Sequence, residues 1–270
     1  MNLEWKGEPV AVRELGQGPP VVLVHGYPLD GAMWSGVARA LSTRFRVFKP
    51  DLPGRGENPT LPAGSIDDYA DFIGAILGHL PGPAGLAGFS MGGYVAFGLL
   101  RAGAPNVGAL ALLDTRAGAD DDAGKSARET SIAAVRSGGA AAIVDGMMAR
   151  LLAPASLQNA SLVERLRRMV LRQKPETIES DLTAMRDRPD STGLLAGIAA
   201  PTLVLAGAED ALTPPAECEA MAAAIPGARY VPIPAAGHLT AMERPGAVAA
   251  ALSEFFAANL AGGSPVANGS

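Results

Sequence analysis

The chain has 270 residues, 48% of them hydrophobic, so it is long enough to bury a large core in one elaborated domain. Its net charge of −5 argues against a nucleic-acid partner, because phosphate binding needs a basic face. One cysteine cannot form an internal disulfide, which fits a reducing compartment. No cysteine and histidine cluster has the spacing of a metal site, and we expect no metal and no other cofactor.

The sequence has no segment typical of export or of a membrane anchor. Residues 1–6 lack the charged start and apolar centre of a signal peptide. Every apolar run is interrupted by glycine, proline or charge before it reaches the roughly 20 residues that span a bilayer. We therefore expect a cytoplasmic protein without a membrane partner.

Short apolar runs alternate along the chain with amphipathic stretches of helical length. The runs predict strands at residues 21–25, 45–49, 84–87, 107–113, 202–206 and 229–232. Such alternation predicts an α/β fold with a mostly parallel central sheet and helices on both faces. Ligand sites in such sheets lie beyond the carboxyl ends of the strands.

The alternation stops between residues 116 and 192, where no strand pattern appears. Helical stretches are expected at 125–137, 139–152, 156–174 and 175–186. A helical insertion directly after a strand would cover the active site as a cap. We thus divide the chain into a core, residues 1–115 and 193–270, and a cap, residues 116–192. The cap has a small excess of basic residues, which indicates either a solvated helix face or an electrostatic gate for anionic substrates.

Ser90 lies at the predicted junction between the strand at 84–87 and the next helix, in the segment Gly88-Phe89-Ser90-Met91-Gly92-Gly93. This pattern is typical of a nucleophile elbow, in which glycines two positions away on either side relieve the clashes of a strained turn. The free N–H groups at the start of the helix would face a developing oxyanion. The alternative is that Ser90 only caps the helix, because Gly-x-Ser-x-Gly also arises by chance in a chain with 33 glycines.

A serine nucleophile needs a base, and the chain has three histidines. His238 lies on a loop after the predicted strand at 229–232, from which it can reach a serine distant in sequence. His79 ends an amphipathic stretch, which indicates a helix-terminal role. His25 leaves the first buried strand. We predict His238 as the base.

The base needs a carboxylate that orients its ring. Asp210 follows the predicted strand at 202–206, and the chain order Ser90, Asp210, His238 is that of the α/β-hydrolase arrangement. Two other acids compete for this role. Glu209 is adjacent but should point the other way, and Asp114 ends the preceding strand. We prefer Asp210.

These motifs resemble the α/β-hydrolase superfamily over nearly the whole chain. Besides the serine motif, the matching segments are His25-Gly26-Tyr27-Pro28-Leu29-Asp30, Asp51-Leu52-Pro53-Gly54-Arg55-Gly56, Gly207-Ala208-Glu209-Asp210 and Gly237-His238. Within the superfamily, the chain looks most like bacterial serine esterases, enol-lactonases of the 3-oxoadipate type, and the cofactor-free haloperoxidase and perhydrolase branch. The resemblance implies a helical cap after the sixth strand of the fold.

The same resemblance implies an oxyanion hole made of the backbone N–H groups of Tyr27 and Met91. It also places His25 behind the oxyanion loop as structural support. Relatives that open alkyl halides or epoxides carry aspartate at the nucleophile position, so Ser90 favours acyl transfer.

The sequence therefore predicts a hydrolase that cleaves a carboxylic ester or lactone of a small to medium, mainly apolar substrate through an acyl-enzyme. A carbon-carbon bond hydrolase or lyase, a perhydrolase side activity and a non-catalytic ligand-binding member remain alternatives. Candidate substrate contacts are Trp34, Met147, Met148 and Leu151, although the same residue types at helical spacing also serve packing. The sequence leaves the oligomeric state open.

Overall fold

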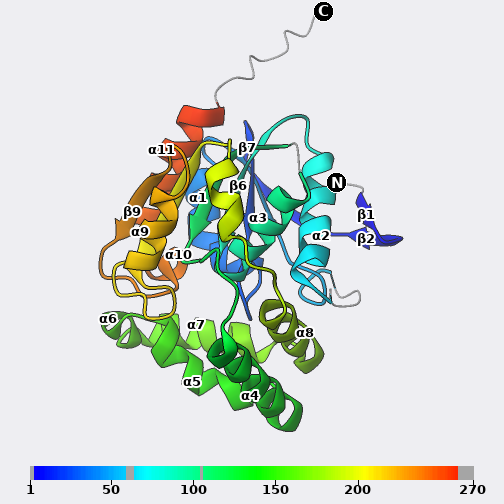
Figure 1. Ribbon diagram of the computed structural model, residues 1–270, viewed down its shortest axis with the longest axis vertical. Helices are drawn as coiled ribbons and strands as arrows, with labels where there is room; N and C mark the ends of the chain where they lie inside the picture. Colours follow the sequence, from blue (N-terminus) through cyan, green and yellow to red (C-terminus); the bar gives the residue numbers. More distant parts are fainter. Residues whose placement is uncertain (1–2, 59–63, 104–105, 261–270) are drawn as a thin grey trace, which may run out of the picture.

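The computed structural model describes residues 3–58, 64–103 and 106–260. Among them, seven strands form a central sheet in the order β3-β5-β4-β6-β7-β8-β9 (Figure 1). The strands are β3 (Val12–Leu15), β4 (Pro20–Val24), β5 (Arg46–Pro50), β6 (Ala84–Phe89), β7 (Val107–Leu113), β8 (Thr202–Gly207) and β9 (Arg229–Ile233). Only β3 pairs antiparallel, with β5, and the remaining neighbours are parallel. The expected mostly parallel α/β sheet is confirmed.

The strands β4, β6 and β7 consist of apolar residues because helices cover both faces of the sheet. Every residue of β6 and β8 is buried. The edge strand β3 and a separate hairpin, β1 (Leu3–Trp5) with β2 (Glu8–Val10), were not predicted. These three strands are short and carry charged residues, so they show no continuous apolar run.

Two layers of helices sandwich the sheet. One layer contains α1 (Ser35–Leu41), which follows the 3₁₀ turn η1 (Gly31–Trp34), and α11 (Pro245–Leu260), which follows α10 (Thr240–Glu243). The other contains α2 (Ile66–Gly78), α3 (Met91–Arg101) and α9 (Pro215–Ala223). Residues of β4 alternate between them: Val22 and Val24 pack toward α2 and α3, whereas Val21 and Leu23 pack toward α1 and α11.

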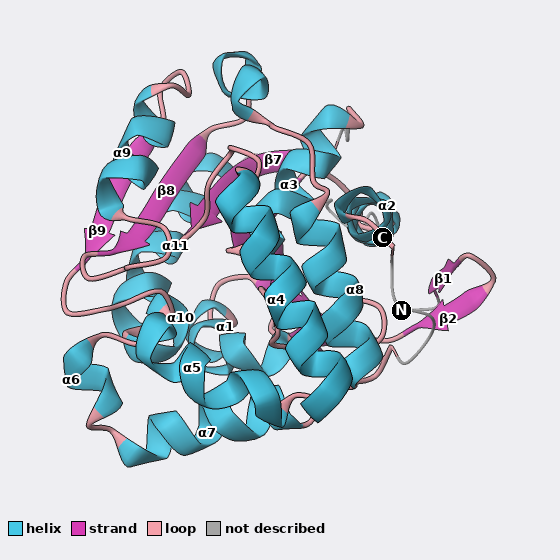
Figure 2. Ribbon diagram, turned by 60° about the horizontal axis from the view of Figure 1, so that its bottom comes forward, coloured by secondary structure: helices cyan, strands magenta, loops and turns pink. Residues whose placement is uncertain are grey.

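Five helices between β7 and β8 lie together beyond the carboxyl ends of the strands, at the bottom of Figure 1 and in front in Figure 2. They are α4 (Asp122–Gly138), α5 (Ala141–Leu151), α6 (Pro154–Leu157), α7 (Ala160–Leu171) and α8 (Pro175–Arg186), and the 3₁₀ turn η2 (Thr192–Gly197) leads back to the core. They occupy the position expected of the cap, after β7, which is the fifth strand of the described sheet in chain order. The domain boundaries at 115 and 193 stay a prediction.

The predicted helix at 156–174 is two helices. Asn159 interrupts it, because its side chain accepts a hydrogen bond from the N–H of Leu162 at 3.1 Å and so caps α7. Among the described residues, no helix is both long and apolar enough to cross a membrane.

Candidate active site

Ser90 lies in a strained turn between β6 and α3. Its φ of 51° and ψ of −113° fall in a region that costs a side chain on the order of 1–3 kcal/mol. The neighbouring glycines are required by space: a Cβ on Gly88 would lie 2.4 Å from the carbonyl oxygen of Gly92, and a Cβ on Gly92 would lie 2.4 Å from that of Val24. The turn therefore has the geometry expected of a nucleophile elbow.

His238 meets Ser90 from the loop that follows β9. Its Nε2 lies 2.9 Å from the Oγ of Ser90. The ring is 3% exposed and packs against Phe89, with the ring centroids 5.2 Å apart. The residues that are 148 positions apart in sequence are thus in hydrogen-bond contact.

Asp210 orients the other side of the imidazole. Its Oδ2 lies 2.8 Å from the Nδ1 of His238 and accepts a hydrogen bond from the Thr213 hydroxyl, while its Oδ1 accepts from the N–H groups of Leu212 and Thr213. Burial alone would raise the pKa of the Asp210 carboxyl, but the bond and charge of His238 and the donors of Thr213 hold that pKa below its usual value. An ionised carboxylate at Nδ1 assigns the ring proton to Nδ1, which leaves Nε2 able to accept from Ser90.

The two competing acids do not reach the imidazole. Asp114 is fully buried, and it accepts hydrogen bonds from the N–H of Gly207 and from the hydroxyl of Thr240. Burial, and secondly the charge of Asp210, raise the pKa of Asp114 well above its usual value. Glu209 is exposed, and its backbone N–H bonds to Ala236. The acid in contact with His238 is Asp210.

The two expected oxyanion donors, the backbone N–H groups of Tyr27 and Met91, lie on separate segments of the core. Met91 is the first residue of α3, and Tyr27 lies in the loop after β4. Neither group donates a hydrogen bond to another of the described residues. Both therefore stay candidates for the oxyanion hole.

His25 braces the loop that carries Tyr27. Its Nδ1 lies 3.0 Å from the carbonyl oxygen of Gly26, and its Nε2 lies 3.0 Å from the backbone N of Leu52. Burial, with the charge of Arg55 second, lowers the pKa of His25 to about 4. A neutral ring with the proton on Nδ1 satisfies both contacts, in agreement with a supporting role.

A cavity of about 310 Å³ opens onto Ser90 and His238. Two of the candidate substrate contacts, Met147 and Leu151, line it. Met148 and Trp34 do not: both are buried in a hydrophobic cluster, Met148 on the cap helix α5 and Trp34 edge-on against Phe89. Their prediction as substrate contacts is corrected, because the apolar pattern at these positions reflects packing.

Several residues of the cavity escaped the sequence reasoning. They are Tyr94, Arg116, Asp120, Arg128, Ile143, Arg150 and Leu182. Two of them could have been indicated once the cap was predicted. Ile143 and Arg150 share one face of α5 with Met147 and Leu151, as their helical spacing shows.

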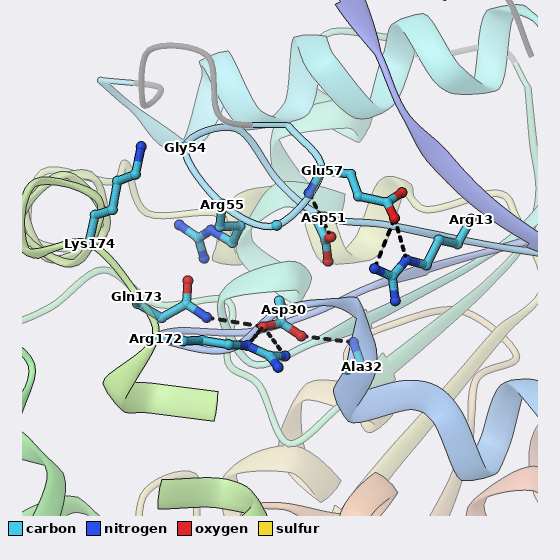
Figure 3. A pocket seen from close by; sticks show the side chains of 11 residues that line it. Arg13, Asp30, Ala32, Asp51, Gly54, Arg55, Glu57, Arg172, Gln173 and Lys174 are labelled. Atoms are coloured by element: carbon cyan, nitrogen blue, oxygen red, sulfur yellow. Dashed lines mark hydrogen bonds and ion pairs between the residues drawn. The ribbon is translucent and has the colours of Figure 1, made fainter. Parts of the chain in front are cut away.

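A second cavity, of about 450 Å³, lies away from Ser90 and His238 (Figure 3). It lies between loops of the core and the turn that joins α7 to α8. Figure 3 shows two bonded groups in its wall: Asp30 accepts hydrogen bonds from Arg172 and Gln173, and Arg13 donates to Glu57. Within the described part of the chain, no cluster of histidine, cysteine and acidic residues could hold a metal ion. The smaller cavity, which Ser90 and His238 line, is the candidate active site.

A model of the alpha/beta hydrolase family matches residues 21–251. The chain belongs to this family. A thermophilic esterase from Thermogutta terrifontis, solved with malate bound, is 38% identical to it at a TM-score of 0.90, with 96% of this chain and 97% of that one covered. The enol-lactonase from Burkholderia xenovorans LB400 is 26% identical at a TM-score of 0.85, over 93% of this chain and 97% of that one.

Curated relatives point to the same reaction class. The pimeloyl-(acyl-carrier protein) methyl ester esterase of Chromobacterium violaceum is 32% identical over 237 residues, which are 84% of this chain and 90% of that protein. The same enzyme of Nitrosomonas europaea is 28% identical over 239 residues, 85% of this chain and 92% of that protein. The chain is a carboxylic ester hydrolase of the alpha/beta hydrolase fold, as the sequence predicted.

Proposed function

We propose that the protein hydrolyses carboxylic esters or lactones of small to medium size through an acyl-enzyme on Ser90. The observation that carries this proposal is the continuous hydrogen-bonded chain from Ser90 through His238 to Asp210, with contacts of 2.9 and 2.8 Å. Such a chain gives a serine hydroxyl a base at the distance needed for proton transfer.

In the first step, the Oγ of Ser90 attacks the ester carbonyl carbon while Nε2 of His238 takes its proton. Asp210 stabilises the imidazolium that forms. The oxyanion accepts hydrogen bonds from the N–H groups of Tyr27 and Met91, and losing one such donor typically costs about 3 kcal/mol of transition-state stabilisation. His238 then protonates the leaving alcohol. Water repeats the sequence on the acyl-enzyme and releases the acid.

The cavity supports a substrate with an apolar part. Apolar surface comes from two cap helices, Met147 and Leu151 on α5 and Leu182 and Met185 on α8. Methionine adapts to different shapes, which suits a site that takes several acyl or alcohol groups. The lining also contains charged residues, so the expected mainly apolar character describes only part of the wall. A cytoplasmic location stays a prediction.

The names of the relatives suggest specific substrates to test. The curated relatives above act on a methyl ester of a pimeloyl group held by acyl-carrier protein, and one structural relative is an enol-lactonase. We therefore include methyl esters and lactones beside p-nitrophenyl esters in the substrate panel. Diketones test the carbon-carbon bond alternative, and peracid formation from hydrogen peroxide tests the perhydrolase activity.

The decisive experiment compares variants on a short-chain p-nitrophenyl ester. Ser90→Ala and His238→Ala should each lower kcat by a factor of about 10⁴ or more. Ser161→Ala and His79→Ala, which change exposed residues outside the cavity, serve as controls. Full activity of either site variant would refute the assignment. Failure of a fluorophosphonate probe to label Ser90 in the native protein would favour a non-catalytic ligand-binding role.

A further inference from the structure

The cavity at Ser90 carries more positive than negative charge. Among its lining residues are three arginines, Arg116, Arg128 and Arg150, but only one carboxylate, Asp120. Asp120 is bound by Arg128 at 3.0 Å and by Arg188 at 2.8 Å. Burial alone would raise the pKa of Asp120, but these two guanidinium groups hold it below its usual value. The one acid of the cavity is therefore ionised and already shared between two cations.

Arg150 differs from the other two arginines of the cavity. Arg128 is bound to Asp120, and Arg116 donates to the carbonyl oxygen of Leu212 and lies 3.4 Å from the carboxylate of Glu217. Arg150 has no ion pair or hydrogen bond from its guanidinium to any residue that the structure describes. Arg150 is an exposed residue that lines the cavity, so its charge is open to a ligand there and is not neutralised by an ion pair with a described residue.

The place of Arg150 on α5 adds an apolar neighbourhood to that charge. Arg150 follows Ile143 and Met147 at helical spacing and adjoins Leu151, and all four residues line the cavity. Leu182 and Met185 of α8 line it as well. A ligand that fits this wall has an apolar chain that ends in an anion.

We propose that Arg150 forms an anion subsite and that the preferred substrate is an ester carrying a carboxylate, separated from the ester group by a short apolar chain. This inference rests on the proposed function, because it assumes that the ester group lies at Ser90. A guanidinium binds a carboxylate through two parallel N–H···O bonds, a geometry that an ammonium group cannot reproduce. The charges of Arg116 and Arg128 add to the positive potential of the cavity.

The test compares two series of methyl esters of increasing chain length, the monoesters of straight dicarboxylic acids and the esters of monocarboxylic acids of equal length. The readout is the ratio of kcat/KM for the anionic ester to that for its neutral counterpart. We expect a ratio above one in the native enzyme at the best chain length. Arg150→Met should lower this ratio about tenfold, and Arg150→Lys should restore part of it.

A matched control removes the same charge from the cap outside the cavity. Arg165 is exposed on α7 and does not line this cavity, so Arg165→Met should leave the ratio unchanged. A further pair, acetyl esters of hydroxy acids against those of simple alcohols, places the carboxylate on the alcohol part. A preference for the anionic ester in either pair that depends on Arg150 supports the subsite.

Three results would overturn the proposal. They are equal turnover of anionic and neutral esters by the native enzyme, an unchanged ratio in Arg150→Met, and an equal fall of the ratio in Arg165→Met. The failure of this inference is separable from that of the proposed function. A native enzyme that hydrolyses neutral esters through Ser90 without a charge preference lacks the subsite, whereas Ser90→Ala with full activity on both series would refute the function itself.

Discussion

Replacing Glu243 by glutamine should disturb both the fold and the catalytic loop, because one buried carboxylate holds the backbone on both sides of His238. Glu243 is 7% exposed. Its Oε1 accepts hydrogen bonds from the N–H groups of Gly237 at 3.0 Å and Leu239 at 3.2 Å, and its Oε2 accepts from the N–H of Ala153 at 2.9 Å. The same side chain thus joins the His238 loop to the end of the cap helix α5.

Glutamine has one acceptor oxygen in place of two. If that oxygen stays on Gly237 and Leu239, the amide NH₂ faces the N–H of Ala153, and two donors oppose each other. Losing one charge-assisted bond and leaving a buried donor unsatisfied costs about 2–3 kcal/mol. Glu243→Ala loses all three bonds, so its cost should be roughly twice as large. Either change is a substantial part of a total stability on the order of 5–15 kcal/mol.

Urea denaturation and kcat on a p-nitrophenyl ester measure the two consequences. The control is Glu254→Gln, which alters an exposed acid of α11 that pairs with Arg229 at the surface and should cost about 0–1 kcal/mol. We expect Glu243→Gln to lower kcat more than it raises KM, because it shifts the base and not the ester. If Glu243→Gln matched the control in both stability and kcat, the argument that this carboxylate positions His238 would be wrong.

Three further outcomes follow from the geometry. Gly88→Ala should cost about 1–3 kcal/mol of stability and most of the activity, because its Cβ would lie 2.4 Å from the carbonyl oxygen of Gly92. Native-like stability in urea denaturation together with native-like turnover would contradict this. Arg55→Met should cost about 3–5 kcal/mol, because it removes the cation 2.6 Å from the buried Asp181 and leaves that carboxylate only the hydroxyl of Tyr69. Arg13→Met, at an exposed ion pair, should cost about 0–1 kcal/mol, and equal effects of the two changes in urea denaturation would refute the distinction. Asp114→Asn should stabilise the protein more at pH 7 than at pH 4. The pKa of Asp114 is raised in the folded protein, so above the unfolded pKa of about 3.9 the unfolded chain ionises more readily and the native protein loses stability as the pH rises, a loss that asparagine avoids. A stability difference between variant and native protein that does not grow from pH 4 to pH 7 would contradict this sign.

The sequence could predict the parts of the molecule that repeat a local physical rule. The apolar runs at 107–113 and 202–206 mark strands because both faces of a parallel sheet are covered, and β7 and β8 coincide with them within one residue. Ser90, Asp210 and His238 could be named because each follows such a strand, and the structure brings them into contact.

What the sequence could not predict depends on tertiary contacts. Trp34 and Met148 carry side chains suited to a pocket, yet both are buried in a hydrophobic cluster and do not line the cavity, because only the fold decides which face of a helix meets it. The break at Asn159 depends on one side-chain cap inside an otherwise helical pattern. Arg150 is one of many cap arginines in the sequence, and its lack of a partner is visible only in three dimensions.

The buried contact of Arg55 with Asp181 has a consequence for how a reactant reaches the serine. Arg55 comes from the loop after β5 and Asp181 from α8, so lifting this side of the cap would have to separate an ion pair that is buried in the closed structure, with its two atoms 2.6 Å apart. Glu243 ties the other flank at Ala153. We therefore expect the cap to stay in place when an ester enters. The width of the entering group, and not an opening movement of the cap, should then be the first determinant of selectivity.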